Sequence, residues 1–421
     1  MTASERAALV GLLSPQRHAA DPEHALDELA GLAEAAGARV VLRLLQERPK
    51  PDPATFLGSG KVDTLAAACA ESRVDVVIFD NELSPAQLRN LEERLGVKVI
   101  DRTQLILDIF ARRARSREGK LQVELAQLKY LMPRLAGRGT ALSRLGGGIG
   151  TRGPGETKLE TDRRRIRYRL AGLSREIEEV RRRRGQLRER RHKSAVPTVA
   201  LVGYTNAGKT TLFNALTGED ARASNALFVT LDPLVRRVKL PDQRQLLISD
   251  TVGFIDRLPH PIVAAFRATL EEAADADLLL HVIDAAAPDR ERHIETVRDV
   301  LLEIGASRVP LLDVFNKADM LDDAERRRVR ALHPAGFCIS ALRGEGRNEL
   351  LDTIASRLAL DTARVTLEFD LQNGQRDALA DVYRHGRVLR HLSNGARVSV
   401  EAELPRRVLP RFAEFRKGAL P

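Results

Sequence analysis

Residues Pro197–Leu216 read PTVALVGYTNAGKTTLFNAL. An apolar run of strand character leads into Gly203-x-x-x-x-Gly208-Lys209-Thr210, and a helical pattern follows. The glycines let backbone amides approach phosphate oxygens, and Lys209 supplies a positive charge for the β- and γ-phosphates. The hydroxyl of Thr210 is suited to binding Mg²⁺, and the start of the helix adds partial positive charge. The stretch therefore predicts a P-loop nucleotide-binding domain.

A second motif, LLISDTVGFI, follows at residues 246–255. Asp250 ends an apolar strand, where it can hold Mg²⁺ through a water, and Gly253 leaves room for its amide to face the γ-phosphate. Many GTPases continue such a motif with a glutamine that orients the attacking water. Here the next residue is Phe254, which forms no side-chain hydrogen bond. Between the two motifs, LFVTLDPLVRR contains Thr230, which we expect to close on Mg²⁺ when the γ-phosphate is present.

Base selection is predicted by VPLLDVFNKADM at residues 309–320. The carboxylate of Asp319 can accept hydrogen bonds from the N1–H and the N2 amine of guanine, which adenine cannot reciprocate. A site of this kind rejects the wrong base because a buried carboxylate would be left unpaired. This motif predicts GTP over ATP. FCISALRGEG, at 337–346, supplies a loop that backs the guanine.

Five sequence elements thus occur in the order typical of a GTPase, and they define the predicted site. The predicted catalytic groups are Lys209, Thr230 and Gly253, and the predicted Mg²⁺ ligands are Thr210, Thr230 and Asp250. The predicted nucleotide contacts are Gly203, Tyr204, Thr205, Asn206, Ala207, Gly208, Lys209, Thr210, Thr211, Phe228, Val229, Thr230, Asp250, Thr251, Val252, Gly253, Asn316, Lys317, Asp319, Ser340, Ala341 and Leu342.

The region from residue 38 to residue 101 alternates strand and helix patterns. ARVVLRLL, VDVVIFD and VKVID are short apolar runs, and Ser84 with Pro85 is typical of a helix start. Apolar strands alternating with helices predict a small parallel α/β domain. The stretch Gly58-Ser59-Gly60-Lys61 lacks the earlier glycine of a P-loop, so we interpret it as a loop leading into a helix.

Two long helices are predicted next, one over 104–135 and one from about Thr157 to Lys193, joined by the glycine-dense LGGGIGTRGPGE. Apolar residues recur at helical spacing in both, which favours an antiparallel hairpin. The chain is predicted to be an α/β protein with four parts: an N-terminal α/β domain (1–103), a basic helical hairpin (104–195), a P-loop GTPase domain (196–360) and a small α+β C-terminal domain (361–421).

The formal net charge is +10, which favours a polyanionic partner, either nucleic acid or an anionic membrane surface. A GC-rich genome and a solvated helix face are the alternatives for this arginine content. Only 4% of residues are aromatic, so phosphate contacts on structured RNA are favoured over base stacking. Three basic clusters gather in the central region: Arg112, Arg113, Arg115, Arg117 and Lys120; Arg163, Arg164, Arg165, Arg167 and Arg169; and Arg181–Arg184 with Arg188, Arg190, Arg191 and Lys193.

Several classes of protein are disfavoured. Cys69 and Cys338 are the two cysteines, which argues against a disulfide scaffold and a zinc site. No apolar run approaches the ~20 residues needed to cross a bilayer. The first residues, MTASERAALV, do not have the pattern of a secretion signal. We therefore expect a cytoplasmic protein without a transmembrane segment, for which peripheral membrane contact stays open.

The chain resembles translational-class P-loop GTPases, and specifically the HflX family, over nearly its whole length. The stretches that carry the resemblance are FLGSGKVDTL, VIFDNELSPAQLRNLE, DRTQLILDIFARRARSREGKLQVELAQLKYLMPRL, GGGIGTRGPGETKLETDRRRI, LFVTLDPLVRR and DTVGFI. Val229 and Leu234 depart from the smaller or hydroxylated residues expected there. The resemblance implies a GTPase that binds the large ribosomal subunit and splits stalled or idle ribosomes, often under stress. It implies that the N-terminal domain and the hairpin engage the ribosome.

Two hypotheses concern hydrolysis. With Phe254 in place of glutamine, we expect slow intrinsic hydrolysis that the ribosome accelerates by ordering the segments around Thr230 and Gly253. Asn206 either binds K⁺, as in some GTPases that lack the glutamine, or stabilises its loop. We expect a monomer. Two other functions stay open: an RNA-modifying or RNA-remodelling GTPase, and a GTP-dependent signalling switch acting on protein partners.

Overall fold

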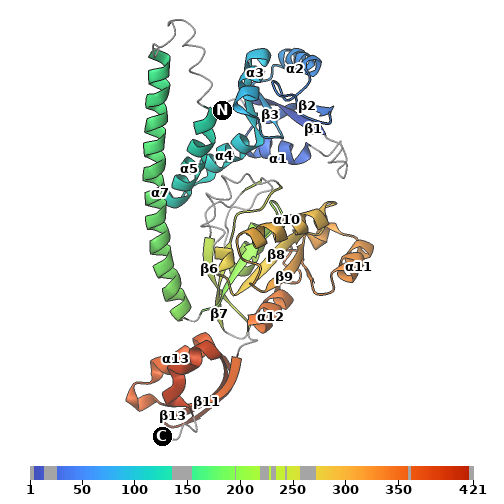
Figure 1. The fold of residues 1–421 in the computed structure, drawn as a ribbon. Coiled ribbons are helices and arrows are strands. Elements are labelled where there is room, and N and C mark those ends of the chain that lie inside the picture. Colours follow the sequence, from blue (N-terminus) through green and yellow to red (C-terminus); the bar gives the residue numbers. More distant parts are fainter. Residues whose placement is uncertain are drawn as a thin grey trace. The chain divides into compact units, whose positions relative to one another are not determined.

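A computed structural model describes residues 4–13, 26–134, 154–194, 196–218, 227–228, 234–241, 244–256, 272–358 and 362–416. The chain forms two compact units. One comprises Met1–Arg181, Ser224–Asp232 and Arg257–Arg267, and the other comprises Arg182–Ala223, Pro233–Asp256 and Ala268–Pro421. Figure 1 labels most of their helices and strands. Within the described part of the chain, no helix is both long and apolar enough to cross a membrane.

The N-terminal sheet has four parallel strands in the order β2-β1-β3-β4, which confirms the predicted parallel α/β domain. Its strands are β1 (Arg6–Leu13), β2 (Arg39–Glu47), β3 (Val76–Phe79) and β4 (Lys98–Asp101). Its helices are α1 (Asp27–Ala35), α2 (Ser59–Glu71) and α3 (Pro85–Leu95). Ser84 caps α3 by accepting a hydrogen bond from the backbone N–H of Gln87. Strand β1 lies inside the sheet, yet its residues were not among the predicted strands.

The prediction of one helix over 104–135 is wrong, because two helices occupy this stretch. They are α4 (Arg102–Arg113) and α5 (Arg117–Arg134). Ala114 takes an extended conformation, with ψ of 113°, and ends α4. The hydroxyl of Ser116 then accepts a hydrogen bond from the backbone N–H of Gly119 at 2.9 Å and caps the next helix. Helix α4 buries Leu105, Ile106 and Ile109 beside the N-terminal sheet.

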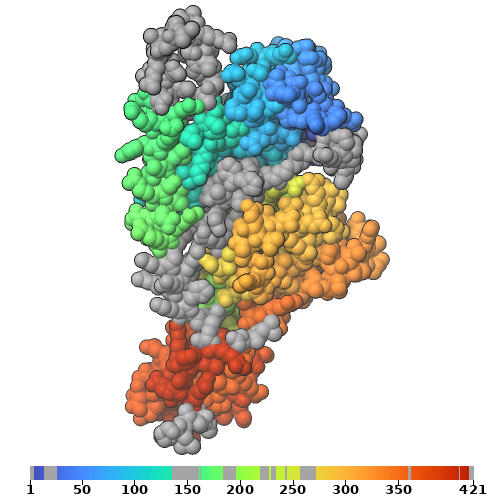
Figure 2. Space-filling model, viewed as in Figure 1, coloured from blue at the N-terminus to red at the C-terminus, as the bar shows by residue number. Residues whose placement is uncertain are grey.

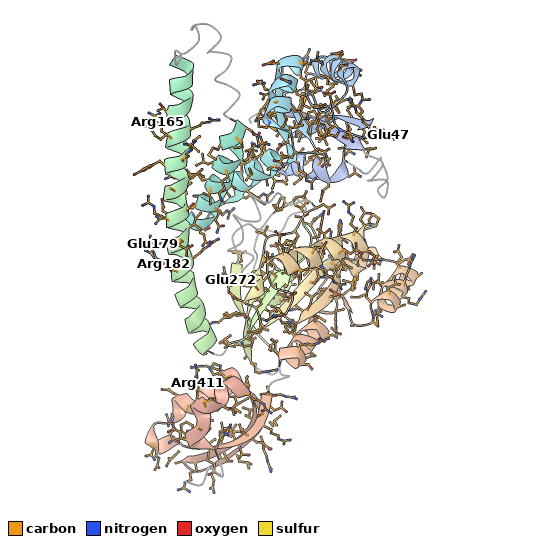
Figure 3. The ribbon with its side chains drawn as sticks, in the orientation of Figure 1. Glu47, Arg165, Glu179, Arg182, Glu272 and Arg411 are labelled. Atoms are coloured by element: carbon orange, nitrogen blue, oxygen red, sulfur yellow. The ribbon has the colours of Figure 1, made fainter. Side chains whose placement is uncertain are left out.

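Helices α5 and α7 (Pro154–Ser194) pack in antiparallel directions, as predicted. Their shared core contains Leu121 and Leu125 of α5 with Leu173 and Ile177 of α7. Two ion pairs also join the antiparallel helices: Arg169 of α7 with Glu124 of α5 at 2.7 Å, and Arg117 of α5 with Glu176 of α7 at 3.3 Å. Arg165, Glu179 and Arg182 project from α7 in Figure 3. Most of the predicted glycine-rich loop lies outside the described residues.

The second sheet has six strands in the order β10-β9-β8-β5-β7-β6, with β6 antiparallel to β7 and the other pairs parallel. The strands are β5 (Thr198–Val202), β6 (Leu234–Lys239), β7 (Gln245–Asp250), β8 (Leu278–Asp284), β9 (Leu311–Asn316) and β10 (Phe337–Cys338). The helices are α8 (Lys209–Thr217), α10 (Arg290–Glu303), α11 (Asp323–Leu332) and α12 (Arg347–Leu358). The predicted nucleotide motifs follow the carboxyl ends of β5, β7 and β9, so the topology gathers them at one edge.

The C-terminal part is an antiparallel sheet in the order β11-β13-β12, coloured orange to red in Figure 2. It contains β11 (Thr362–Asp370), β12 (Arg387–Asn394) and β13 (Arg397–Pro405). Helix α13 (Arg376–His385) and the 3-10 segment η5 (Arg406–Phe415) complete it. Its separate core includes Leu367, Phe369, Val382 and Val400. The fold therefore matches the predicted α/β class with a small α+β end.

Candidate guanine-nucleotide site

The loop between β5 and α8 has the backbone geometry that phosphate binding needs. Gly203 has φ of 153°, and a Cβ added there would lie 2.2 Å from the carbonyl oxygen of Val282, so only glycine fits. Asn206 has φ of 62°, and its side chain is exposed. Because the loop runs directly into the first turn of α8, the free amides of that helix face the same space.

Lys209 is buried at the start of α8. Its Nζ donates to the carbonyl oxygens of Gly203 at 3.0 Å and Tyr204 at 2.7 Å. Burial lowers the pKa of Lys209 to about 8, although the negative charge of Asp250 partly opposes this. The loop thus holds the ammonium group by its own carbonyls, and a phosphate bound beside it would favour its charged form.

The side chains of Thr210 and Asp250 meet beside the loop. The hydroxyl of Thr210 donates to Oδ2 of Asp250 at 2.8 Å, and Asp250 is fully buried at the end of β7. A hydroxyl and a carboxylate are hard oxygen donors of the kind that Mg²⁺ prefers, and Mg²⁺ completes its shell with water and phosphate oxygens. The pair therefore fits Mg²⁺. Within the described ranges, no group of three or more His, Cys, Asp or Glu side chains forms a metal site.

The segment after Asp250 crosses the P-loop. Thr251 donates its hydroxyl proton to the carbonyl of Leu201 at 2.6 Å. At Gly253, an added Cβ would lie 2.9 Å from Nζ of Lys209 and from Cα of Thr205. This close approach requires glycine, and it brings the backbone of Gly253 beside the lysine that is predicted to bind the γ-phosphate.

The base-recognition motif is held by a buried asparagine that joins three loops. Asn316 donates through Nδ2 to the carbonyl of Ala207 at 3.0 Å and accepts through Oδ1 from the N–H of Ala341 at 2.9 Å. Lys317 has φ of 62°, and its Nζ pairs with Asp284 at 2.7 Å. The P-loop and the loop after β10 are therefore fixed to each other through β9.

Asp319, the predicted acceptor of hydrogen bonds from guanine, lies on the 3-10 turn after β9 (η3, Ala318–Met320). The buried hydroxyl of Ser340 donates to Asp319 Oδ1 at 2.6 Å. This hydrogen bond, with the nearby Arg343 and Arg326, holds the pKa of Asp319 below its usual value. The carboxylate is thus kept ionised, as hydrogen bonding to guanine requires. Leu342, at the tip of the same loop, is 80% exposed.

Within the second unit, the structure brings together the predicted site residues of the P-loop, of the end of β7 and the segment after it, and of the loops after β9 and β10. Phe228 belongs to the first compact unit, where its ring packs edge-on against Phe110 of α4 at 4.7 Å between centroids. Val229 and Thr230 lie outside the described residues. Asp284, which forms the ion pair with Lys317, was not predicted from the sequence, because it belongs to none of the nucleotide motifs.

Three family models match the chain in succession. They are described as GTP-binding GTPase N-terminal (residues 23–111), GTP-binding GTPase Middle Region (113–191) and 50S ribosome-binding GTPase (198–317). Together they cover more than half of the chain, including the P-loop and the start of the base-recognition motif.

Curated relatives extend the similarity. GTPase HflX of Caldanaerobacter subterraneus subsp. tengcongensis is 46% identical over 98% of this chain and 94% of its own. GTPase HflX of Escherichia coli K12 is 49% identical over 83% of each chain. Among solved structures, a GTP-binding protein from Sulfolobus solfataricus in complex with GDP is 27% identical, covers 84% of this chain and 98% of its own, and has a TM-score of 0.46.

Proposed function

The chain belongs to the HflX family of GTPases, and from this membership we propose that it binds the large ribosomal subunit and splits stalled or idle ribosomes. The membership itself establishes GTP binding, hydrolysis to GDP and phosphate, and the usual dependence on Mg²⁺. The proposal that the protein binds ribosomes rests on one observation: residues 198–317 match the family described as a 50S ribosome-binding GTPase.

We assign the site residues as follows. Lys209 and the P-loop amides hold the β- and γ-phosphates, and Thr210, Asp250 and Thr230 hold Mg²⁺. Bound Mg²⁺ neutralises charge on the phosphates. Asp319 selects guanine. The contact between Thr210 and Asp250, the position of Lys209 and the hydrogen bond from Ser340 to Asp319 support these roles.

The ribosomal contact, in our proposal, is made by the N-terminal domain (1–103) and the basic hairpin (104–195). The structure of α7 supports this part. Its apolar residues face α5, where Arg169 also pairs with Glu124. Arg164, Arg165 and Arg167 are exposed, as is Tyr168, which is 79% exposed. A helix with clustered exposed guanidinium groups is suited to phosphates of structured RNA. The other two proposed parts are the GTPase domain (196–360) and the C-terminal domain (361–421).

We also propose that K⁺ binds next to Asn206 and offsets negative charge during hydrolysis. The exposed side chain of Asn206, on a loop with positive φ, supports this. Hydrolysis rates measured in KCl and in NaCl at equal ionic strength test it, and equal rates would remove K⁺ from the mechanism. A cytoplasmic location follows from the proposed ribosomal target, and we propose a monomeric state separately.

Cosedimentation with purified ribosomal particles tests the proposed function. The full-length protein is mixed with large subunits in GTP, GDP or a non-hydrolysable GTP analogue, over a series of salt concentrations. We expect binding that is tightest with the analogue and weakens with salt. Anionic lipid vesicles provide the comparison. Binding to vesicles without binding to ribosomal particles would replace the proposal by a membrane-associated switch.

A further inference from the structure

The residues after Gly253 are held by helix α10 and by the P-loop tyrosine. The backbone N–H of Asp256 donates to the hydroxyl oxygen of Tyr204 at 2.9 Å. The carboxylate of Asp256 accepts a hydrogen bond from the hydroxyl of Thr296 at 3.1 Å and forms an ion pair with Arg292. Asp256 is therefore fixed through both its backbone and its side chain.

Tyr204 is fixed in turn. Its ring stacks on the ring of His293, with 3.8 Å between centroids and 15° between planes, and Tyr204 is nearly buried. The backbone carbonyl of the same residue accepts a hydrogen bond from Nζ of Lys209. One residue thus connects the phosphate-binding lysine, through its backbone, to the segment after Gly253, through its side chain.

A second pair of contacts holds the segment from the other end. The N–H of Phe254 donates to the carbonyl of Gly203 at 3.0 Å, and the N–H of Thr205 donates to the carbonyl of Phe254 at 2.7 Å. The stretch from Gly253 to Asp256 is therefore attached to the P-loop at Phe254 and to α10 at Asp256. We call Tyr204, Asp256, Arg292, His293 and Thr296 the switch clamp.

We propose that the switch clamp positions groups for GTP hydrolysis by fixing the backbone around Gly253. Main-chain groups then orient the attacking water, as a glutamine side chain does in many GTPases. Phe254 offers no polar side-chain atom, while the backbone of Gly253 lies so close to Lys209 that an added Cβ would be 2.9 Å from Nζ, so main-chain groups here are placed to hydrogen-bond to the γ-phosphate and the attacking water. Phosphoryl transfer depends mainly on such positioning, and a shift of about 1 Å is costly. The inference rests on GTP hydrolysis and not on ribosome binding.

Substitutions of single hydroxyl groups test the clamp in the full-length protein. Tyr204→Phe keeps the stacked ring and removes the acceptor for the N–H of Asp256. Thr296→Val keeps the shape and removes the hydroxyl, which also lies 2.9 Å from the carbonyl of Arg292. Thr296→Ser restores that hydroxyl. Tyr383→Phe is the matched control, because the Tyr383 hydroxyl lies 2.6 Å from Nδ1 of His391, beside β12 in the C-terminal sheet.

The measurements are the single-turnover rate of intrinsic GTP hydrolysis, the affinity for GDP, and the affinity for GDP with aluminium fluoride, which mimics the transition state. We expect Tyr204→Phe and Thr296→Val each to slow hydrolysis about fivefold, as loss of one hydrogen bond allows. They should also weaken binding of the mimic, while GDP affinity stays within about twofold because GDP has no γ-phosphate. Thr296→Ser and Tyr383→Phe should have the same hydrolysis rate and the same two affinities as the unsubstituted protein.

Two results would overturn the inference. One is an unchanged hydrolysis rate in both Tyr204→Phe and Thr296→Val. The other is a loss of GDP affinity equal to the loss of rate, since that pattern indicates general damage to the nucleotide site. Cosedimentation with ribosomal particles is a separate readout, so a failure of the ribosomal proposal would leave this result interpretable.

Discussion

Phe254 and Tyr204 form a parallel backbone bridge between the segment after β7 and the P-loop. The Phe254 side chain is fully buried, and two backbone hydrogen bonds hold its peptide groups. The residue in the glutamine position is therefore a structural element of the site. Its buried ring anchors the chain at this point.

Replacement of Phe254 by glutamine is expected to lower hydrolysis and not to restore a missing group. A buried amide without partners costs about 1–3 kcal/mol, in addition to the loss of apolar packing. We expect an intrinsic rate about tenfold lower and a lower melting temperature. Phe254→Leu is the control, because the side chain stays apolar. The hydrolysis rate and the melting temperature should both fall less in this variant than in Phe254→Gln. A faster rate in Phe254→Gln would show that the site lacks only a polar side chain.

Nucleotide binding is expected to change the protonation of Lys209. Burial lowers the pKa of Lys209 to about 8 from 10.5. Phosphate oxygens favour the charged form and raise this pKa, so binding takes up a proton above pH 8 and none from this group well below it. Calorimetry of GDP binding in buffers of different ionisation enthalpy measures the uptake. It should grow from pH 7 to pH 9. In Lys209→Arg the side chain stays charged over this pH range. If proton uptake on GDP binding rose between pH 7 and pH 9 in this variant as well, its assignment to Lys209 would be refuted.

Loss of the Asp319 carboxylate is expected to remove guanine selectivity. Two hydrogen bonds from guanine to a carboxylate together contribute about 3 kcal/mol or more, which corresponds to a loss of GDP affinity of about 100-fold in Asp319→Ala. Affinity for adenine nucleotides should hardly change. Asp323→Ala, at an exposed position on α11, is the matched control. Tight GDP binding by Asp319→Ala would place guanine elsewhere.

The exposed arginines of α7 are expected to contribute to ribosome binding and not to intrinsic hydrolysis. Replacement of Arg164, Arg165 and Arg167 by glutamine should weaken cosedimentation with large subunits. It should also reduce the slope of log affinity against log salt, by about one for each phosphate that the protein no longer binds. The matched control replaces three exposed arginines of α11: Arg327, Arg328 and Arg330. Equal effects of the two triple variants would indicate a general effect of charge.

The backbone geometry of the P-loop could be predicted from the sequence because it depends on local requirements. A P-loop needs glycine at defined positions, and Gly203 is held against the carbonyl of Val282 where no side chain fits. Strand β1 was missed because its sequence, RAALVGLL, is rich in alanine and leucine, which favour helices as much as strands. Its place inside the sheet is decided by its neighbours β2 and β3.

Two other features depend on contacts that no local pattern reports. The break between α4 and α5 follows from Ala114 and from the cap at Ser116, which interrupt an otherwise continuous helical periodicity. The switch clamp joins Tyr204 and Asp256 to a helix that begins more than thirty residues later in the chain. Tyr204 lies in the P-loop motif, but Asp256, Arg292, His293 and Thr296 belong to none of the nucleotide motifs, so the folded arrangement is what brings the five residues together.

The rate of GTP hydrolysis with and without large ribosomal subunits tests most directly whether this site is completed by the ribosome. It is measured under single-turnover conditions with the full-length protein. We expect slow hydrolysis alone and an increase of about tenfold or more at saturating subunits, since added groups and ordered loops stabilise the transition state. A rate that does not rise when large subunits are added would contradict the proposal.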